Sequence, residues 1–536
     1  MSADAWWKNG IVYQIYPRSF QDSDGDGIGD LRGIQRRLDY LVELGVDAVW
    51  ISPIYPSPMA DFGYDISDYC NVDPRFGTLE DFDALAAECK ARSLKLVLDF
   101  VPNHTSDRHP WFVQSRGSRN NPKRDWYLWR DPAPGGGPPN NWLSNFGGPA
   151  WTFDEVSGQY YCHSFLKEQP DLNWRNPEVR QAMYDVLRFW LRRGVDGFRV
   201  DVLYHLIKDV EFRDNPQNPS FQVGQDPSHQ LLPLYTTDRP EMQDIIVEMR
   251  RVVDEFSDEA SARVLIGELY LPLERLMAYY GRTSDGLLQG VQLPFNFQLI
   301  TAPWHAADID RIVRNYEAAL PHGAAPNWVL GNHDKPRIAS RVGQERARLA
   351  AMLLLTLRGT PTLYYGDEIG LTDVPIPPDE VQDPFEKNEP GKGLGRDPQR
   401  TPMQWSGAHA AGFTDGTPWL RLGGDWGMRN VEAQQGDSAS MLQLYKKLIA
   451  LRRNEPALHE GSHEQLEAGA DVLAYARSAG KRRLVVLLNF TTSETPVAAE
   501  LLPAETVVLV STHADRTGAL KGGLVLQPLE GVIVAQ

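Results

Sequence analysis

Four acidic residues end short apolar or β-branched runs in this chain, and helix-like segments separate the runs. The acids are Asp99, Asp201, Glu268 and Asp334, and the runs before them span residues 95–98, 197–200, 263–267 and 327–333. Parallel strands that alternate with helices and carry acids at their C-terminal ends are typical of the rim of a (β/α)8 barrel. The sequence therefore predicts an α/β fold, a (β/α)8 TIM barrel with these four acids on one rim.

The alternation of strand and helix patterns continues over most of the chain, as a parallel sheet requires. Strands are expected near residues 11–16, 47–51, 95–99, 197–201, 263–268, 291–294, 327–334 and 362–365. Helices are expected near residues 31–44, 177–193, 240–256, 344–358 and 441–453, and another begins at Thr78 with a capping-type sequence. The eight expected strands are the number that closes such a barrel.

Two segments depart from this alternation. Residues 103–170 lack a helical period and are rich in aromatic residues. Because a loop of that length is seldom without structure, we expect an inserted subdomain after the third strand. From about residue 455 the pattern changes to β-type runs separated by turns, which predicts a C-terminal antiparallel β-sandwich domain. The predicted domains are a barrel of residues 1–102 and 171–454, an inserted subdomain of residues 103–170 and a C-terminal domain of residues 455–536.

The composition of the chain argues against nucleic-acid and membrane partners. The chain has 536 residues and a formal net charge of -17 without a basic cluster, which argues against a nucleic-acid partner. Residues 1–8 do not resemble a signal peptide and no apolar run approaches the length of a membrane span, so we expect a cytoplasmic protein without a membrane partner. The three cysteines suit neither a disulfide framework nor a thiolate metal site. We expect a monomer or homodimer that acts on small neutral molecules.

The strand-end acids suit the cleavage of an acetal bond between sugars. This reaction needs one carboxylate that faces the anomeric carbon and one protonated acid that faces the leaving oxygen. Asp201 lies two residues from Arg199 on one strand, so both side chains share a face, and the guanidinium should keep the Asp201 carboxylate ionised as a nucleophile. Glu268 has no cation beside it in the sequence, so burial should raise its pKa and suit it as the acid and base.

The neighbouring pair His333 and Asp334 supplies an imidazole and a third carboxylate. Both groups can hydrogen-bond sugar hydroxyls, and such bonds strengthen as the sugar ring flattens in the transition state. We therefore expect Asp334 to stabilise the transition state.

Several segments together resemble the α-amylase superfamily of retaining glycoside hydrolases. Residues 99–104, 197–201, 267–268 and 332–334 resemble its four motifs in order, and residues 6–20, 169–173 and 400–405 are similar to its oligo-1,6-glucosidase and α-glucosidase branch. The resemblance covers nearly the whole chain. It implies the TIM barrel, a β-glucosyl ester on Asp201, proton transfer by Glu268 and a separation of roughly 5 Å between their carboxyl groups.

The resemblance also implies a set of substrate-binding residues. They are Asp61, Tyr64, His104, Phe146, Phe165, Arg199, His333 and Arg400. An ion pair between Arg400 and Asp61 would close the end of the pocket and restrict attack to the terminal sugar. The expected activity is therefore an exo-acting α-glucosidase that releases α-glucose from maltose-like sugars and transfers glucose to sugar or alcohol acceptors. No organic cofactor is expected.

Acidic residues alternate around glycines in residues 22–30, an arrangement that can wrap a hard divalent cation. The segment resembles the first part of an EF-hand loop, although Gly33 stands where the closing glutamate would be. Related glucosidases carry Ca2+ or Mg2+ in a similar loop. The implied ligands of one structural Ca2+ or Mg2+ are Asp22, Asp24, Asp26, Asp30 and the carbonyl of Ile28.

Alternative functions have their own signatures. A metal-dependent hydrolase would need a compact ligand spacing around His104 and His333, which the sequence lacks. An endo-acting amylase would share the four motifs but not the pocket closure. Two alternatives of the same family are an oligo-1,6-glucosidase and an enzyme that hydrolyses or isomerises sucrose. They differ from the main reading in linkage preference. Val202, the residue after the expected nucleophile, resembles the residue found there in α-1,6-cleaving members. A non-catalytic carbohydrate-binding or transporter-associated homologue would have lost the three acids.

Overall fold

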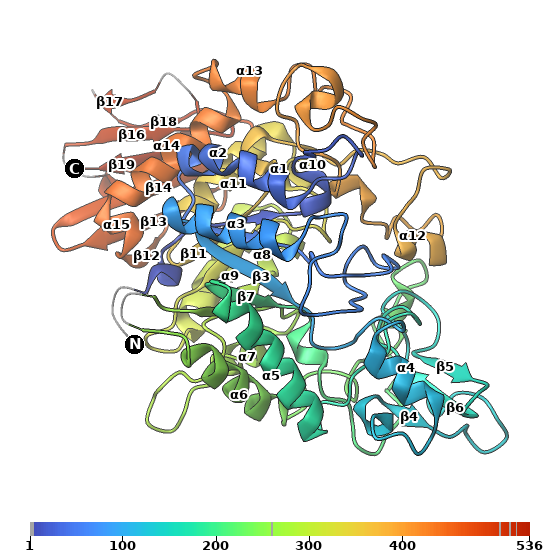
Figure 1. Ribbon diagram of the computed structural model, residues 1–536. Coiled ribbons are helices and arrows are strands. Elements are labelled where there is room, and N and C mark those ends of the chain that lie inside the picture. Colours follow the sequence, from blue (N-terminus) through green and yellow to red (C-terminus); the bar gives the residue numbers. More distant parts are fainter. Residues whose placement is uncertain (1–4, 259–260, 503–504, 514–515, 521–522, 536) are drawn as a thin grey trace.

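The computed structural model describes residues 5–258, 261–502, 505–513, 516–520 and 523–535. Eight parallel strands form a closed barrel in the order β1-β11-β10-β9-β8-β7-β3-β2. The strands are β1 (Val12–Ile15), β2 (Ala48–Ile51), β3 (Lys95–Phe100), β7 (Gly197–Val200), β8 (Val264–Gly267), β9 (Leu293–Asn296), β10 (Asn327–Val329) and β11 (Thr360–Tyr364). The predicted TIM barrel is confirmed, and Figure 1 shows it between the inserted segment and the C-terminal sheet.

The main helices between the strands bury apolar side chains in the core around the barrel. They are α3 (Leu79–Ala91), α5 (Pro177–Arg192), α6 (Met242–Asp254), α9 (Ala306–Ala319), α11 (Gln344–Thr356) and α14 (Met441–Asn454). In α5, Val179, Met183, Leu187 and Trp190 recur at helical spacing and are buried. Thr78 caps α3 in a capping box with Asp81, as its sequence predicts. The shorter helices are α7 (Leu273–Ala278), α8 (Gln298–Thr301), α10 (Ile338–Val342), α12 (Pro384–Asn388), α13 (Val431–Gln435) and α15 (Pro456–His459).

Two expected elements have different limits. The helix expected at 31–44 is divided into α1 (Leu31–Arg36) and α2 (Leu38–Leu44) at Arg37, whose guanidinium donates to Gln21 Oε1 and stacks on the Trp405 ring. Strand β10 ends at Val329. Asp334 therefore stands in the loop beyond the strand and not at its end.

A three-stranded antiparallel sheet lies between β3 and α5. Its strands are β4 (Trp129–Arg130), β5 (Trp151–Asp154) and β6 (Gln159–Cys162), in the order β4-β6-β5, and helix α4 (Pro110–Gly117) precedes them. The two ends of this segment meet, because Thr105 N donates to Pro170 O and Leu172 N donates to Asn103 O. The expected subdomain therefore has its own sheet, while its limits at residues 103 and 170 stay a prediction.

The C-terminal segment forms a six-stranded antiparallel sheet, β12-β13-β14-β19-β16-β17, and a two-stranded sheet, β15-β18. The strands are β12 (Ser462–Leu466), β13 (Val472–Ala479), β14 (Arg482–Asn489), β15 (Thr495–Pro496), β16 (Val507–Ser511), β17 (Gly518–Ala519), β18 (Val525–Leu526) and β19 (Gly531–Ala535). Alternate residues serve two cores, since Leu473 and Tyr475 join the barrel core whereas Val472 and Ala474 pack with Leu526. Within the described part of the chain, no helix has the length and apolar character of a membrane span.

Candidate active site

The side chain of Arg199 gathers three carboxylates at the C-terminal end of the barrel. Its Nη1 lies 2.7 Å from Asp99 Oδ1 and 2.7 Å from Asp201 Oδ1, while its Nη2 lies 2.6 Å from Glu268 Oε2. These residues come from the neighbouring strands β3, β7 and β8, in which Asp99 and Arg199 stand in register. Asp201 and Glu268 therefore lie on the two terminal nitrogens of one guanidinium.

This gathering alters the expected electrostatics. Burial raises the pKa of Asp201 and outweighs the opposing effect of Arg199, because Glu268 and Asp99 add negative charge nearby. The same burial raises the pKa of Asp99 to about 6. Arg199 therefore lowers the pKa of Asp201 as expected, but burial and the neighbouring carboxylates outweigh this effect and leave the pKa raised. The fold also brings Arg199 to Glu268, which the local sequence around Glu268 did not indicate.

Asp334 and His333 lie beside this cluster. Arg400 Nη2 donates to Asp334 Oδ1 at 2.8 Å, and His333 Nε2 lies 3.3 Å from Asp334 Oδ2. The positive charges of Arg400 and Arg396 hold the pKa of Asp334 far below its ordinary value, against the effect of burial. Asp334 is therefore a fixed negative charge, and its side chain is 24% exposed.

Hydrogen bonds fix the ring of His333. Gln14 Nε2 lies 2.7 Å from His333 Nδ1, so the amide donates to Nδ1 and the ring proton is assigned to Nε2. Tyr64 OH lies 2.7 Å from Nε2 and donates to Asp99 Oδ2 at 3.0 Å. Burial lowers the pKa of His333 well below its ordinary value, so the imidazole is neutral.

Asp61 is paired with Arg396 and not with Arg400. Arg396 Nη2 lies 2.6 Å from Asp61 Oδ1, and Arg396 Nε donates to Asp383 Oδ2 at 2.6 Å. Arg400 is fully buried and contacts His333 O and Asp334. The expected Arg400–Asp61 ion pair is therefore wrong, because the turn at residues 397–399 places Arg396 over Asp61 and turns Arg400 toward Asp334.

Residues 169–173 support the same end of the site. Gln169 Nε2 donates to Asp61 Oδ2 at 3.1 Å and lies 3.1 Å from His104 Nε2. Asp171 forms a buried ion pair with Lys208 at 2.7 Å. Burial lowers the pKa of His104 to about 4, so this imidazole is also neutral.

The two predicted aromatic walls lie on this side. The Phe165 ring is 5.3 Å from that of His104 and 5.7 Å from that of Phe146. Phe146 also contacts Phe385 of α12, at 5.1 Å between ring centres, and the Arg396 guanidinium lies 4.8 Å from its ring. The inserted segment and the loop after β11 therefore meet at Arg396 beside Asp61.

Val202, directly after Asp201, has a left-handed backbone with φ of 35°. This conformation is rare for a β-branched residue and indicates local strain. It aims the Val202 N–H at Glu268 Oε2, 2.9 Å away. Oε2 thus accepts one hydrogen bond and pairs with Arg199, whereas Oε1 has no hydrogen-bond partner among the described residues.

A model of the α-amylase catalytic domain matches residues 14–461 of this chain. The chain belongs to the α-amylase family. Among its relatives in this family, a probable α-glucosidase of Rhizobium meliloti (strain 1021) is 43% identical over 530 residues, 95% of this chain and 94% of that protein. An oligo-1,6-glucosidase of Parageobacillus thermoglucosidasius is 40% identical, over 92% of this chain and 91% of that protein.

Two solved structures of the α-amylase fold are similar to this chain over nearly its whole length. The α-glucosyl transfer enzyme XgtA matches with a TM-score of 0.91 and 40% identity, over 99% of both chains. The trehalulose synthase MutB of Pseudomonas mesoacidophila MX-45 matches with a TM-score of 0.89 and 36% identity, over 100% of both chains. These similarities confirm the expected family, and this member of it is a glycoside hydrolase rather than a non-catalytic homologue.

Sequence reasoning did not include Arg396, Asp383 or Lys208 among the site residues of this α-amylase family member. Arg396 lies 335 positions from its partner Asp61, and Lys208 lies 37 positions from Asp171, so no local pattern connects them. The segment 169–173 gave a partial signal as a motif, but only the structure shows that its acid Asp171 is fully buried and so needs a cation.

The acidic loop at residues 22–30 brings three of its predicted ligands together. Carboxylate oxygens of Asp22, Asp24 and Asp30 lie within 4.8 Å of one another. The Asp26 carboxylate is outside this group, and its Oδ1 accepts from Ile28 N at 2.7 Å. Among the described residues, no lysine or arginine forms an ion pair with these acids. Three uncompensated carboxylates fit a hard divalent cation.

Proposed function

We propose that this protein is a retaining, exo-acting α-glucosidase that releases α-glucose from the non-reducing end of maltose-like di- and oligosaccharides and also transfers glucose to acceptors. The observation that carries the proposal is the placement of Asp201 and Glu268 on one guanidinium, at 2.7 and 2.6 Å. Retaining glycosidases use two carboxyl groups that flank one anomeric carbon.

Asp201 acts as the nucleophile. Its Oδ1 is held by Arg199, and its Oδ2 has no hydrogen-bond partner among the described residues, which leaves it able to attack the anomeric carbon. Glu268 donates a proton from Oε1 to the leaving oxygen and then takes one from water or an acceptor alcohol. Asp334 stabilises the positive charge on the sugar ring, which suits its depressed pKa.

The exo mode rests on the buried end of the site. Asp61, Arg396, Gln169 and His104 form one connected group there. A terminal glucose can hydrogen-bond this group, whereas a longer chain has no route through it. Analysis of the early products from maltohexaose tests the exo mode. Glucose should be the only small sugar released, and early production of maltose or maltotriose would contradict it.

Linkage preference within this proposal has a second candidate. The named relatives include an oligo-1,6-glucosidase and a trehalulose synthase, and one MutB complex contains the substrate sucrose. Comparison of kcat/KM for maltose, isomaltose, sucrose, trehalose and an aryl α-glucoside decides between them. Maltose should be the preferred disaccharide under the main proposal. A clear preference for isomaltose would favour an oligo-1,6-glucosidase, and conversion of sucrose to an isomer would favour an isomerising enzyme.

We further propose that the 22–30 loop binds one structural Ca2+ or Mg2+ through Asp22, Asp24 and Asp30, with Asp26 and the Ile28 carbonyl as further ligands. Such a cation would link this loop to residues 413–419, because Thr414 Oγ1 donates to Asp22 Oδ2 and Trp419 N donates to Gly27 O. Chelation should lower the Tm, and Ca2+ or Mg2+ should restore it in the wild type but not in Asp24→Asn. An unchanged Tm with no metal found by elemental analysis would refute the site.

The location, the oligomeric state and the small-molecule partners of the protein complete this proposal. A cytoplasmic location and a monomeric or homodimeric state stay predictions, which cell fractionation and light scattering would test. Small α-glucosides and sugar or alcohol acceptors are the proposed partners.

A further inference from the structure

A groove of about 540 Å3 lies along the inserted segment, and its lining shares no residue with the acidic cluster of the site. Four of its lining residues are arginines: Arg119, Arg124, Arg130 and Arg175. The rest of the lining is largely aromatic or apolar, including Trp129, Phe212 and Val210. This arginine groove stands out in a protein whose formal net charge is -17.

Two of the four arginines already have carboxylate partners. Arg119 Nη1 lies 3.1 Å from Asp131 Oδ1, and Arg175 Nη2 lies 2.7 Å from Glu241 Oε1. These two pairs are charge-compensated, so they do not by themselves call for a ligand.

Arg124 and Arg130 form no ion pair with any described carboxylate. Arg124 donates from Nη1 to Ser115 O at 3.0 Å and from Nη2 to Gln159 Oε1. Arg130 donates from Nη1 to Trp129 O at 2.7 Å. Both sets of direct partners are neutral, so neither guanidinium contacts a carboxylate directly.

Both guanidinium groups are ordered before any ligand arrives. The Arg124 guanidinium lies 3.5 Å from the centre of the Trp129 ring, and that of Arg130 lies 3.6 Å from the centre of the Phe212 ring. Stacking fixes the plane of each guanidinium, so little side-chain freedom is lost when N–H groups that remain free bind the oxygens of a carboxylate or phosphate.

The nearby acids compensate Arg124 and Arg130 only from a distance. Asp154 is 2.6 Å from Arg116, and Asp131 is paired with Arg119. Asp125 is the one carboxylate that lines the groove, and it accepts from Asn173 Nδ2 at 3.1 Å. Burial lowers the pKa of Arg124 to about 10, because desolvation of this cation outweighs the attraction of Asp154 and Asp131.

We propose that the arginine groove binds a small organic oxyanion, a carboxylate or a phosphate monoester, through Arg124 and Arg130. The oxygens would accept charge-assisted hydrogen bonds from the two guanidinium groups, and an apolar part would contact Val210 and Leu128 in the same groove. This site is separate from glucoside cleavage and does not depend on the proposed function.

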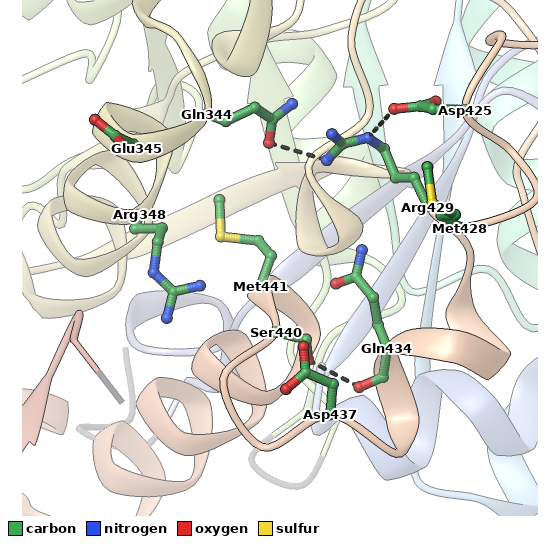
Figure 2. A pocket seen from close by; sticks show the side chains of 10 residues that line it. All are labelled: Gln344, Glu345, Arg348, Asp425, Met428, Arg429, Gln434, Asp437, Ser440 and Met441. Atoms are coloured by element: carbon green, nitrogen blue, oxygen red, sulfur yellow. Dashed lines mark hydrogen bonds and ion pairs between the residues drawn. The ribbon is translucent and has the colours of Figure 1, made fainter. Parts of the chain in front are cut away.

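A second cavity supplies the matched control. It measures about 390 Å3 and lies beside α11 and α14, with the side chains that Figure 2 shows. Its acids Glu345, Asp425 and Asp437 outnumber its arginines Arg348 and Arg429, so it should not attract an anion. Arg348 donates to Thr512 O and forms no ion pair with a described carboxylate, which makes Arg348→Gln a comparable loss of charge elsewhere.

Isothermal titration calorimetry at fixed ionic strength tests the proposal on the full chain. Inorganic phosphate, phenyl phosphate and benzoate are the probes, and benzyl alcohol is the uncharged comparator. We expect saturable binding of phenyl phosphate or benzoate and none of benzyl alcohol. Tighter binding of phenyl phosphate would identify a phosphate site, and tighter binding of benzoate a carboxylate site.

Substitution of Arg124 and Arg130 tests whether that binding occurs in the arginine groove. Arg130→Gln and the double variant Arg124→Gln/Arg130→Gln should weaken it by at least about tenfold, while Arg348→Gln should leave it unchanged. Arg130 is exposed, so the single variant should fold even where the double variant does not. Absence of saturable binding to the wild type, or equal affinity in folded Arg130→Gln, would overturn the proposal.

Discussion

Arg199 Nη2 lies 2.6 Å from Glu268 Oε2, although Glu268 directly follows the next strand of the barrel, β8. The register explains the contact, because Arg199 stands beside Ile266 and Glu268 follows two positions later on the same face. The same guanidinium holds Asp201, so one buried cation sets the positions of both acids that the mechanism needs.

Removal of the proton donor should affect substrates unequally. Glu268→Gln should lower kcat/KM for maltose by about 10²–10⁴ because the leaving oxygen then departs without a proton. The fluoride of an α-glucosyl fluoride leaves with little protonation, so kcat/KM for this substrate should fall less in the variant. Azide should yield a glucosyl azide in this variant. Equal losses on both substrates would contradict the acid role, and the exposed Glu274→Gln serves as the control.

Activity should fall on the acid side at an unusually high pH. Burial raises the pKa of Asp201 and that of Asp99, the latter to about 6. A protonated Asp201 cannot attack, so the loss of kcat/KM on acidification should occur at a pH above the ordinary carboxyl pKa. A pH profile of kcat/KM checks this, and full activity maintained at pH 4.5 would contradict it.

Arg396 should matter for binding of the terminal sugar. Arg396→Gln leaves the buried Asp61 and Asp383 without this cation, and we expect the KM for maltose to rise by roughly 10–100-fold. Arg421, in the same loop region, pairs with Glu380 at the surface, so Arg421→Gln should leave KM unchanged. Steady-state kinetics of both variants make the comparison, and similar KM values would refute the role of Arg396.

Lys208 should stabilise the fold through Asp171. Lys208→Met leaves a buried carboxylate unpaired and should cost about 3–5 kcal/mol of the free energy of unfolding, whereas the exposed Lys447→Met should cost little. The pKa of Asp171 is lowered in the folded protein, so its contribution is present above the unfolded pKa and is lost as the pH falls through the folded value. Urea denaturation should therefore show a smaller loss at low pH than at pH 7. A loss independent of pH would contradict the pairing.

Local patterns predicted the barrel well. A strand-end acid such as Asp201 or Glu268 and a capping box such as that of Thr78 depend on neighbours in the sequence, so their positions were predicted. The division at Arg37 was missed because contacts with distant Gln21 and Trp405 accompany it. The predicted β-sandwich is uneven, with a two-stranded sheet opposite six strands.

Long-range electrostatics was the less predictable part of the site. The pairing of Asp61 with Arg396 and not with Arg400 depends on a turn between the two arginines. The pKa of Asp201 depends on how many carboxylates share Arg199, which requires three strands to be in place. Sequence neighbours identify the acids, but only the fold shows which cation each acid contacts.

The central claim is that Asp201 attacks the anomeric carbon. Incubation with 5-fluoro-α-D-glucosyl fluoride should trap a glucosyl ester, which peptide mass spectrometry of the digested protein would locate. The label is expected on Asp201 in the wild type, and no label is expected in Asp201→Asn. A label on any other residue, or an Asp201→Asn variant that retains full turnover, would contradict it.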